Sequence, residues 1–152
     1  MALLVGVVVV SGGDIQILAQ SADPFVGTWD LDVKASRFKP TAYTRSVIKI
    51  EAIKEQRKTT VDTEVDGGAV IHYEFLAAYD GKDYPMTFLT ADSVVLKRID
   101  ERTIEWTLKQ GGQANAVSVS RLSTDGRTMT VTRKGTSPRG LPTENVLVYK
   151  RR

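Results

Sequence analysis

The chain has 152 residues, the size of one domain, and its 41% hydrophobic and 26% charged residues are typical of a globular protein. It has no cysteine and one histidine, His72, which excludes disulfide frameworks, thiol catalysis and Cys/His zinc sites. No run of acidic residues has the spacing of a calcium loop. The net charge of +3 is only mildly basic, and we expect neither a metal nor a cofactor.

An apolar run opens the chain. Leu3–Val10 reads LLVGVVVV, which is shorter than the roughly 20 residues that a membrane span needs. Ala19–Ser21 has the small-x-small pattern of a signal cleavage site. We therefore interpret residues 1–21 as a signal peptide and residues 22–152 as one domain that is secreted or periplasmic. No Lys or Arg precedes the run and Asp14 interrupts it, so an N-terminal strand or buried tail is the alternative.

From Phe25 onward, apolar residues alternate with polar ones and never keep a helical period for long enough to form a helix. Ile104, Trp106 and Leu108, for example, fall on one face of a strand. Asp-Gly and Gly-Gly pairs separate these runs at short intervals, and they suit hairpin turns because glycine adopts positive φ. The pattern predicts strands at residues 26–33, 43–53, 57–65, 69–79, 84–90, 93–99, 102–109, 113–122, 127–134 and 143–151.

A meander of this length leaves two exposed edges unless it closes on itself. We therefore expect an all-β fold, an antiparallel up-and-down meander closed into a barrel of about eight to ten strands. The apolar face of each strand then points inward, where it can enclose a cavity for a small ligand. The longer irregular stretches, Lys34–Ala42 and Gly135–Pro142, are expected to be loops.

Residues 25–31 read FVGTWDL, which resembles the opening F-x-G-T-W-x-L of the fatty-acid-binding proteins and, more broadly, of the calycin barrels that include the lipocalins. Residues 27–38 and 78–85 are similar to small secreted bacterial proteins of unassigned function with a lipocalin-like fold. The resemblance covers residues 25–152 and implies a calycin-like barrel.

In such a barrel, the resemblance implies that Trp29 plugs the closed end and that Gly27 lets neighbouring chain approach. It also implies that a basic residue from Lys150–Arg152 lies over the indole ring as a cation–π contact.

Two departures from the fatty-acid-binding pattern concern the ligand. Those proteins insert a helix-turn-helix lid after the first strand, but only Asp32–Ala42 is available here, so the cavity is expected to be open-mouthed or collapsed. They also hold the ligand carboxylate with an Arg-x-Tyr pair on the last strand. Here that position reads Leu147-Val148-Tyr149, which keeps the tyrosine and lacks the arginine.

We predict a ligand site on the inward face of the barrel, where a tyrosine hydroxyl or an arginine fixes the polar end of the ligand. Arg133 is the candidate cation, with Arg121 as the alternative. A packed core made of the same side chains is the competing interpretation. The predicted set comprises Tyr73, Phe75, Trp106, Leu108, Val119, Met129, Arg133, Leu147 and Tyr149.

No constellation predicts catalysis. His72 shares a strand face with Glu74, opposite the apolar side chains, and is expected to be solvated or paired across strands; no nucleophile elbow accompanies it. Asp80 and Asp83 flank a Gly-Lys turn and most simply serve a hairpin. We therefore expect no catalytic residue and not an enzyme.

The sequence thus predicts a monomeric carrier of a small apolar or amphipathic ligand, with no membrane span. The basic C-terminus lacks interleaved aromatic residues, so nucleic acid is not an expected partner. The alternative is a filled barrel, such as a secreted inhibitor or envelope-associated protein, that recognises a protein partner through the loops Lys34–Ala42 and Gly135–Pro142.

Overall fold

The computed structural model describes residues 22–137 and 139–152, so the expected signal peptide lies outside the described residues. The described chain forms strands alone, which confirms the all-β expectation, and no described helix could cross a membrane. The strands are β1 (Gly27–Leu31), β2 (Tyr43–Ile53), β3 (Gln56–Val65), β4 (Val70–Ala77), β5 (Asp80–Phe88), β6 (Ala91–Asp100), β7 (Thr103–Gln110), β8 (Gln113–Leu122), β9 (Thr128–Thr136) and β10 (Pro142–Arg151).

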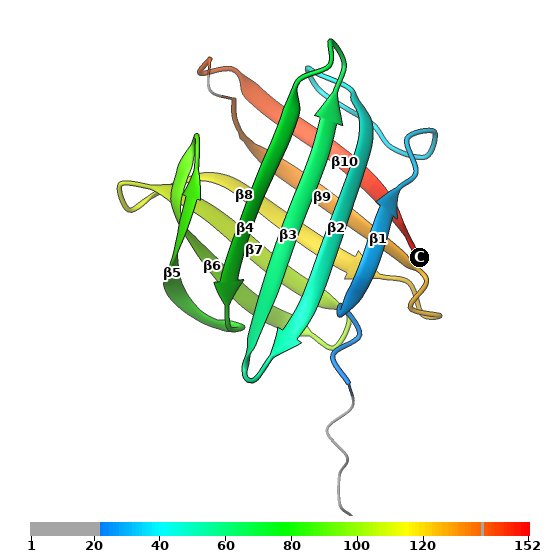
Figure 1. Cartoon of the computed structure of the whole chain (residues 1–152), viewed down its shortest axis with the longest axis vertical. Coiled ribbons are helices and arrows are strands. Elements are labelled where there is room, and N and C mark those ends of the chain that lie inside the picture. Colours follow the sequence, from blue (N-terminus) through cyan, green and yellow to red (C-terminus); the bar gives the residue numbers. More distant parts are fainter. Residues whose placement is uncertain (1–21, 138) are drawn as a thin grey trace, which may run out of the picture.

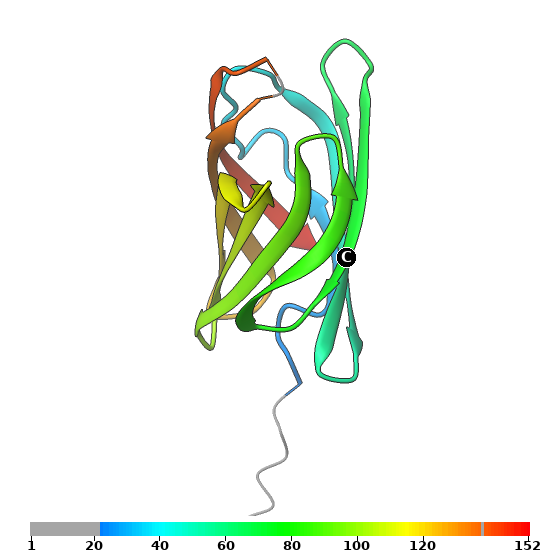
Figure 2. The same cartoon turned by 90° about the vertical axis from the view of Figure 1, so that its left-hand side faces the viewer.

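The strands close into one barrel in the order β1-β10-β9-β8-β7-β6-β5-β4-β3-β2, and every neighbouring pair is antiparallel. The predicted up-and-down meander is therefore confirmed. Figure 1 shows β2, β3 and β4 crossing in front of β7 to β10, and Figure 2 shows the same barrel from the side as two facing layers.

The start of β5 differs from the prediction. The sequence pattern predicts a hairpin turn at Asp80 and Gly81, but Asp80 already pairs with Lys97 in β6, and the register shifts before Asp83 pairs with Val95. Gly81 has a φ of 75°, so its positive φ serves a bulge inside the strand and not a hairpin turn. The Asp80 carboxylate caps this bulge by accepting a hydrogen bond from the backbone amide of Lys82.

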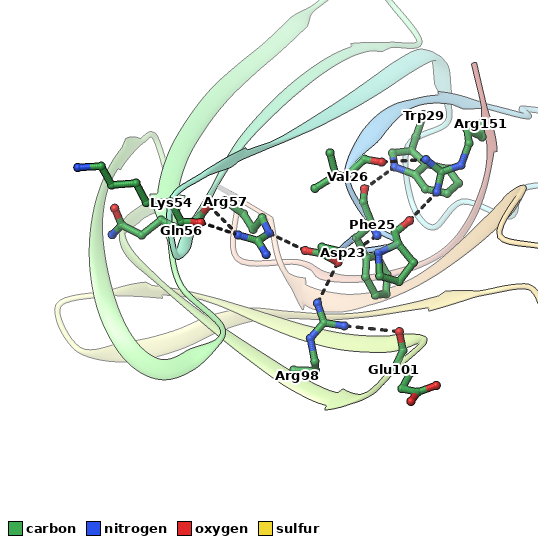
Figure 3. Close-up of polar contacts among 11 residues, drawn as sticks. Asp23, Phe25, Val26, Trp29, Lys54, Gln56, Arg57, Arg98, Glu101 and Arg151 are labelled. Atoms are coloured by element: carbon green, nitrogen blue, oxygen red, sulfur yellow. Dashed lines mark hydrogen bonds and ion pairs between the residues drawn. The ribbon is translucent and has the colours of Figure 1, made fainter. Parts of the chain in front are cut away.

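The closed end of the barrel has the arrangement that the resemblance implies. Trp29 is fully buried, and the Arg151 guanidinium carbon lies 4.1 Å from the centre of the indole ring. Trp29 Nε1 donates a hydrogen bond to the backbone carbonyl of Phe25, 3.0 Å away. Arg151 also donates to the carbonyls of Pro24 and Val26, so the segment before β1 is tied across this end (Figure 3).

Gly27 combines a backbone conformation that favours glycine with a close approach of Arg151, whose guanidinium is held in place by its hydrogen bonds to Pro24 and Val26. Its φ is +145°, and a Cβ atom at this position would lie 2.6 Å from Arg151 Nη1. We expect Gly27→Ala to lower the free energy of unfolding by about 1–3 kcal/mol. Gly126→Ala is the control, because Gly126 also has positive φ but a Cβ atom added there would meet no other atom within 4 Å. Chemical denaturation should show the larger loss for Gly27→Ala; equal losses would contradict the steric explanation.

The prediction that Val119 points into the barrel is wrong. In β8 the buried side chains include Ser118 and Ser120, so Val119 lies on the outer face of the strand. The physical reason is packing across strands, because Ser118 pairs with Trp106 and its small side chain leaves room for the indole. Arg121, on the same outer face, is exposed and cannot serve as the inward cation.

The loop after β1 runs beside β10 in place of a lid. Arg37 and Val146 exchange backbone hydrogen bonds of 2.8 and 2.9 Å, and the Lys39 carbonyl accepts one from Glu144. Since no helix forms among residues 32–42, the expectation that a two-helix lid is missing here is confirmed.

Candidate functional site

A cavity of about 760 Å³ occupies the open half of the barrel, within the range of roughly 300–1,000 Å³ that is usual for small-ligand pockets. Its walls come from inward side chains of β2, β3, β4, β7, β9 and β10, and its rim from the β5–β6 turn and two loops. The wall and rim residues include Lys39, Tyr43, Ile48, Val61, Thr63, Ile71, Tyr73, Phe88, Leu89, Trp106, Val131, Arg133, Ser137, Thr143, Asn145, Leu147 and Tyr149.

Below this cavity the barrel is packed. A second void of about 20 Å³ lies among Phe75, Met129, Trp106 and neighbouring core side chains, which is room for about one water molecule. The sequence analysis left open whether the inward side chains form a packed core or line a ligand cavity. Each interpretation describes one half of the barrel: the closed half is a packed core and the open half is hollow.

The structure brings together five of the nine predicted site residues on the wall of the large cavity. Phe75 and Met129 contact only the small void, and Leu108 is buried in the core beside neither space. Val119 lies outside the barrel. The five wall residues are Tyr73, Trp106, Arg133, Leu147 and Tyr149.

Arg133 places a positive charge in the cavity. Its strand, β9, points Val131 and Arg133 inward, and Arg133 Nη1 donates a hydrogen bond of 3.2 Å to the hydroxyl of Tyr73. Burial lowers the pKa of Arg133, but neighbouring tyrosine oxygens more than offset this, so its pKa stays above the ordinary value and the group stays charged. Among the described residues, no carboxylate lies within 4.0 Å of the guanidinium, unlike the arginines of the ion pairs elsewhere.

A second polar group consists of three hydroxyls. Ser46 Oγ lies 2.8 Å from Thr63 Oγ1 and 3.1 Å from Tyr149 Oη, and all three side chains are buried. Burial raises the pKa of the Tyr149 phenol, so it keeps its proton. The sequence analysis missed Ser46 and Thr63, although strand parity places them on the same faces as Ile48 and Val61.

Asn145 connects the cavity wall to the rim. Its Nδ2 donates to the Tyr43 hydroxyl at 3.4 Å, and its Oδ1 accepts a hydrogen bond of 2.9 Å from the backbone amide of Lys39. Asn145 is buried, so these bonds fix the loop that borders the mouth. The sequence analysis also missed this residue, although it shares the inward parity of Leu147 and Tyr149.

His72 lies at the rim on the outside of the barrel. Its Nδ1 is 2.6 Å from Asp62 Oδ1 on the neighbouring strand, and both side chains are about half exposed. The expected cross-strand pairing is confirmed. The described residues contain no cluster of three or more His, Asp or Glu side chains that could hold a metal ion.

The strand order and the cavity together define a calycin-like barrel with room for a small ligand. No protein-family model matches the chain, and no curated protein matches it. Among solved structures it is similar to the ileal bile acid-binding protein of zebrafish, in complex with cholic acid, with a TM-score of 0.55 and 12% sequence identity. The match covers 85% of this chain and 99% of that one, and it confirms the resemblance in fold.

Proposed function

We propose that this protein binds a small amphipathic anion in the open half of its barrel. The observation that carries the proposal is Arg133, a charged side chain on the wall of an apolar cavity with no carboxylate near it among the described residues. Arg133 is partly buried, and a charge drawn out of water into an apolar wall is costly unless an opposite charge and hydrogen bonds compensate it. An anionic group on the ligand would supply that partner, and the guanidinium offers it donors in a fixed geometry.

The apolar walls supply the rest of the affinity. Ile48, Val61, Trp106, Val131 and Leu147 present hydrocarbon surface to the cavity, and burial of ligand surface against it contributes about 25 cal/mol per Å². A cavity of 760 Å³ favours a container over the filled-barrel alternative. The solved neighbour, which holds cholic acid, supports the same proposal because that ligand is also an amphipathic acid.

We place this activity outside the cytoplasm, on the strength of the apolar run Leu3–Val10 and the cleavage-like pattern at Ala19–Ser21. We propose a carrier and no chemical reaction: the sequence holds no nucleophile elbow, and its one histidine, His72, pairs with Asp62 at an exposed position of β4.

The test compares three probes of equal chain length and different charge by isothermal titration calorimetry: decanoate, 1-decanol and decyltrimethylammonium. We expect decanoate to bind roughly 10-fold more tightly than 1-decanol, since a hydrogen bond to a charged group contributes about 1.5–3 kcal/mol. The ammonium probe should bind weakest. Equal affinity for all three probes, or no binding of any, would overturn the proposal.

A further inference from the structure

The three hydroxyls of Ser46, Thr63 and Tyr149 form a hydrogen-bonded chain that has one more O–H donor than it has hydrogen bonds. Three hydroxyls hold three O–H donors, and the chain contains two hydrogen bonds, one between Ser46 Oγ and Thr63 Oγ1 and one between Ser46 Oγ and Tyr149 Oη. The described residues make no other hydrogen bond to these oxygens. Whichever way the chain is polarised, one O–H donor remains free.

The free donor belongs to the cavity. Thr63 and Tyr149, the two ends of the chain, are both wall residues, whereas the middle member Ser46 is buried behind them. If Tyr149 donates to Ser46 and Ser46 donates to Thr63, the Thr63 proton is free at the wall. If the chain runs the other way, the Tyr149 proton is free at the wall. A third arrangement, in which Thr63 and Tyr149 both donate to Ser46, would leave the buried Ser46 proton with no partner that water or a ligand could supply, at a cost of about 1–3 kcal/mol. The two arrangements with the free proton at the wall are therefore favoured.

Two apolar side chains in place of Ser46 and Thr63 would pack in this wall without leaving a hydrogen-bond donor unpaired. Ser46 and Thr63 are direct partners in the register of β2 and β3, and their inward neighbours along the strands are Ile48 and Val61. A donor without a partner in a buried apolar wall costs about 1–3 kcal/mol. Valine or alanine at these positions would avoid that cost, so packing alone does not account for the hydroxyls.

The hydroxyl chain is also separate from the cation. The Arg133 guanidinium has its own hydroxyl partner, Tyr73 on β4, which takes no part in the chain. Besides the Asn145–Tyr43 pair near the rim, the cavity wall therefore offers a positive charge with one phenol and, apart from it, a neutral hydroxyl donor.

We infer that the ligand carries a neutral oxygen acceptor, a hydroxyl or carbonyl, that meets the Ser46–Thr63–Tyr149 chain while its anionic group meets Arg133. This inference rests on the proposed function and narrows the ligand from any amphipathic anion to an oxygenated one. An unsubstituted hydrocarbon acid would leave the free O–H without a partner on its burial.

The experiment measures decanoate against 2-hydroxydecanoate, 3-hydroxydecanoate and 10-hydroxydecanoate by titration calorimetry on the purified protein. We expect at least one hydroxylated acid to bind roughly 3- to 10-fold more tightly than decanoate, the value of one neutral hydrogen bond. The double variant Thr63→Val/Tyr149→Phe should remove this preference, because either single variant leaves a pair of hydroxyls that still has one free O–H donor. Thr59→Val is the matched control, because Thr59 is a buried threonine on the same strand that lines only the small void.

The outcomes separate this inference from the proposed function. A preference that is absent in the wild type, or that survives in the double variant Thr63→Val/Tyr149→Phe, overturns the inference and leaves anion binding intact. If the double variant weakens the binding of decanoate as much as that of its hydroxylated analogues, the chain serves the carboxylate, and the inference is again wrong. Failure of every acid to bind overturns the proposed function and the inference with it.

Discussion

Replacing Arg133 with methionine should remove the preference of the cavity for anions. Methionine keeps an unbranched apolar stem, although it is shorter than arginine, and it has neither a charge nor donors. We expect the affinity for decanoate to fall roughly 10- to 100-fold, because a charge-assisted hydrogen bond contributes about 1.5–3 kcal/mol. The affinity for 1-decanol should stay the same or rise. Calorimetric titration of both probes at constant ionic strength measures the two effects.

Thermal unfolding of the same variant distinguishes a ligand-binding arginine from a structural one. Arg133 has one hydrogen bond, to Tyr73, and no acidic partner among the described residues. Its removal relieves a desolvation cost at the loss of a single neutral partner. We therefore expect the Tm of Arg133→Met to equal or exceed that of the wild type.

Arg121→Met is the matched control, since it removes the same charge from an exposed position on the outer face of β8. It should leave both affinities unchanged. If Arg133→Met and Arg121→Met reduce decanoate binding equally, the effect comes from the overall charge of the protein, and Arg133 is not the anion site.

Most of the fold could be predicted because its signals are local. Alternation of apolar and polar residues identifies strands such as β7, and the glycines at Gly67–Gly68 and Gly111–Gly112 mark the tight turns that β-hairpins need. The beginning of β5 could not be predicted in this way. Glycine with positive φ serves a bulge as well as a turn, and only the pairing with β6 distinguishes the two at Gly81.

The site was harder to predict than the fold because a cavity depends on which inward side chains are small. Strand parity correctly placed Arg133, Tyr73 and Tyr149 inside the barrel. Hydrophobicity was misleading at Val119, where the serines of β8 face inward and pack beside a tryptophan. Because inward positions were identified by their hydrophobicity, the inward hydroxyls of Ser46 and Thr63 were missed. Which half of the barrel is hollow follows from packing between distant strands, and no local pattern shows it.

At the closed end of the barrel, away from the cavity, one buried carboxylate holds several segments together. The Asp23 side chain is only 4% exposed, and it lies 2.5 Å from Arg57 Nε and 2.9 Å from Arg98 Nη2 (Figure 3). It also accepts a hydrogen bond of 3.1 Å from the backbone amide of Phe25. The Arg98 guanidinium carbon lies 4.4 Å from the centre of the Tyr79 ring. Asp23 thereby ties the segment before β1 to β3 and β6.

Asp23→Asn should therefore be strongly destabilising. Removal of one partner from a buried ion pair costs about 3–5 kcal/mol, and we expect a loss near the lower end of that range because both arginines are partly exposed, at 17% and 31%. Asp30→Asn is the control. Asp30 also pairs with an arginine, Arg152, but the pair is solvent-exposed, and such pairs contribute about 0–1 kcal/mol. Chemical denaturation at neutral pH should separate the two variants; equal losses would contradict a special role for Asp23.

The pH dependence of this loss has a definite sign. Burial raises the pKa of Asp23, but the hydrogen bonds from Arg57, the Phe25 amide and Arg98 outweigh it, so the pKa lies below the ordinary value of 3.8. A carboxylate whose pKa is lower in the folded state stabilises that state fully above the unfolded value, and this contribution disappears as the pH falls through the folded value. The difference in Tm between wild type and Asp23→Asn should therefore be constant from neutral pH to about pH 5 and shrink below about pH 4. A difference that persists unchanged in strong acid would show that the Asp23→Asn variant is destabilised by altered packing and not by loss of the charge.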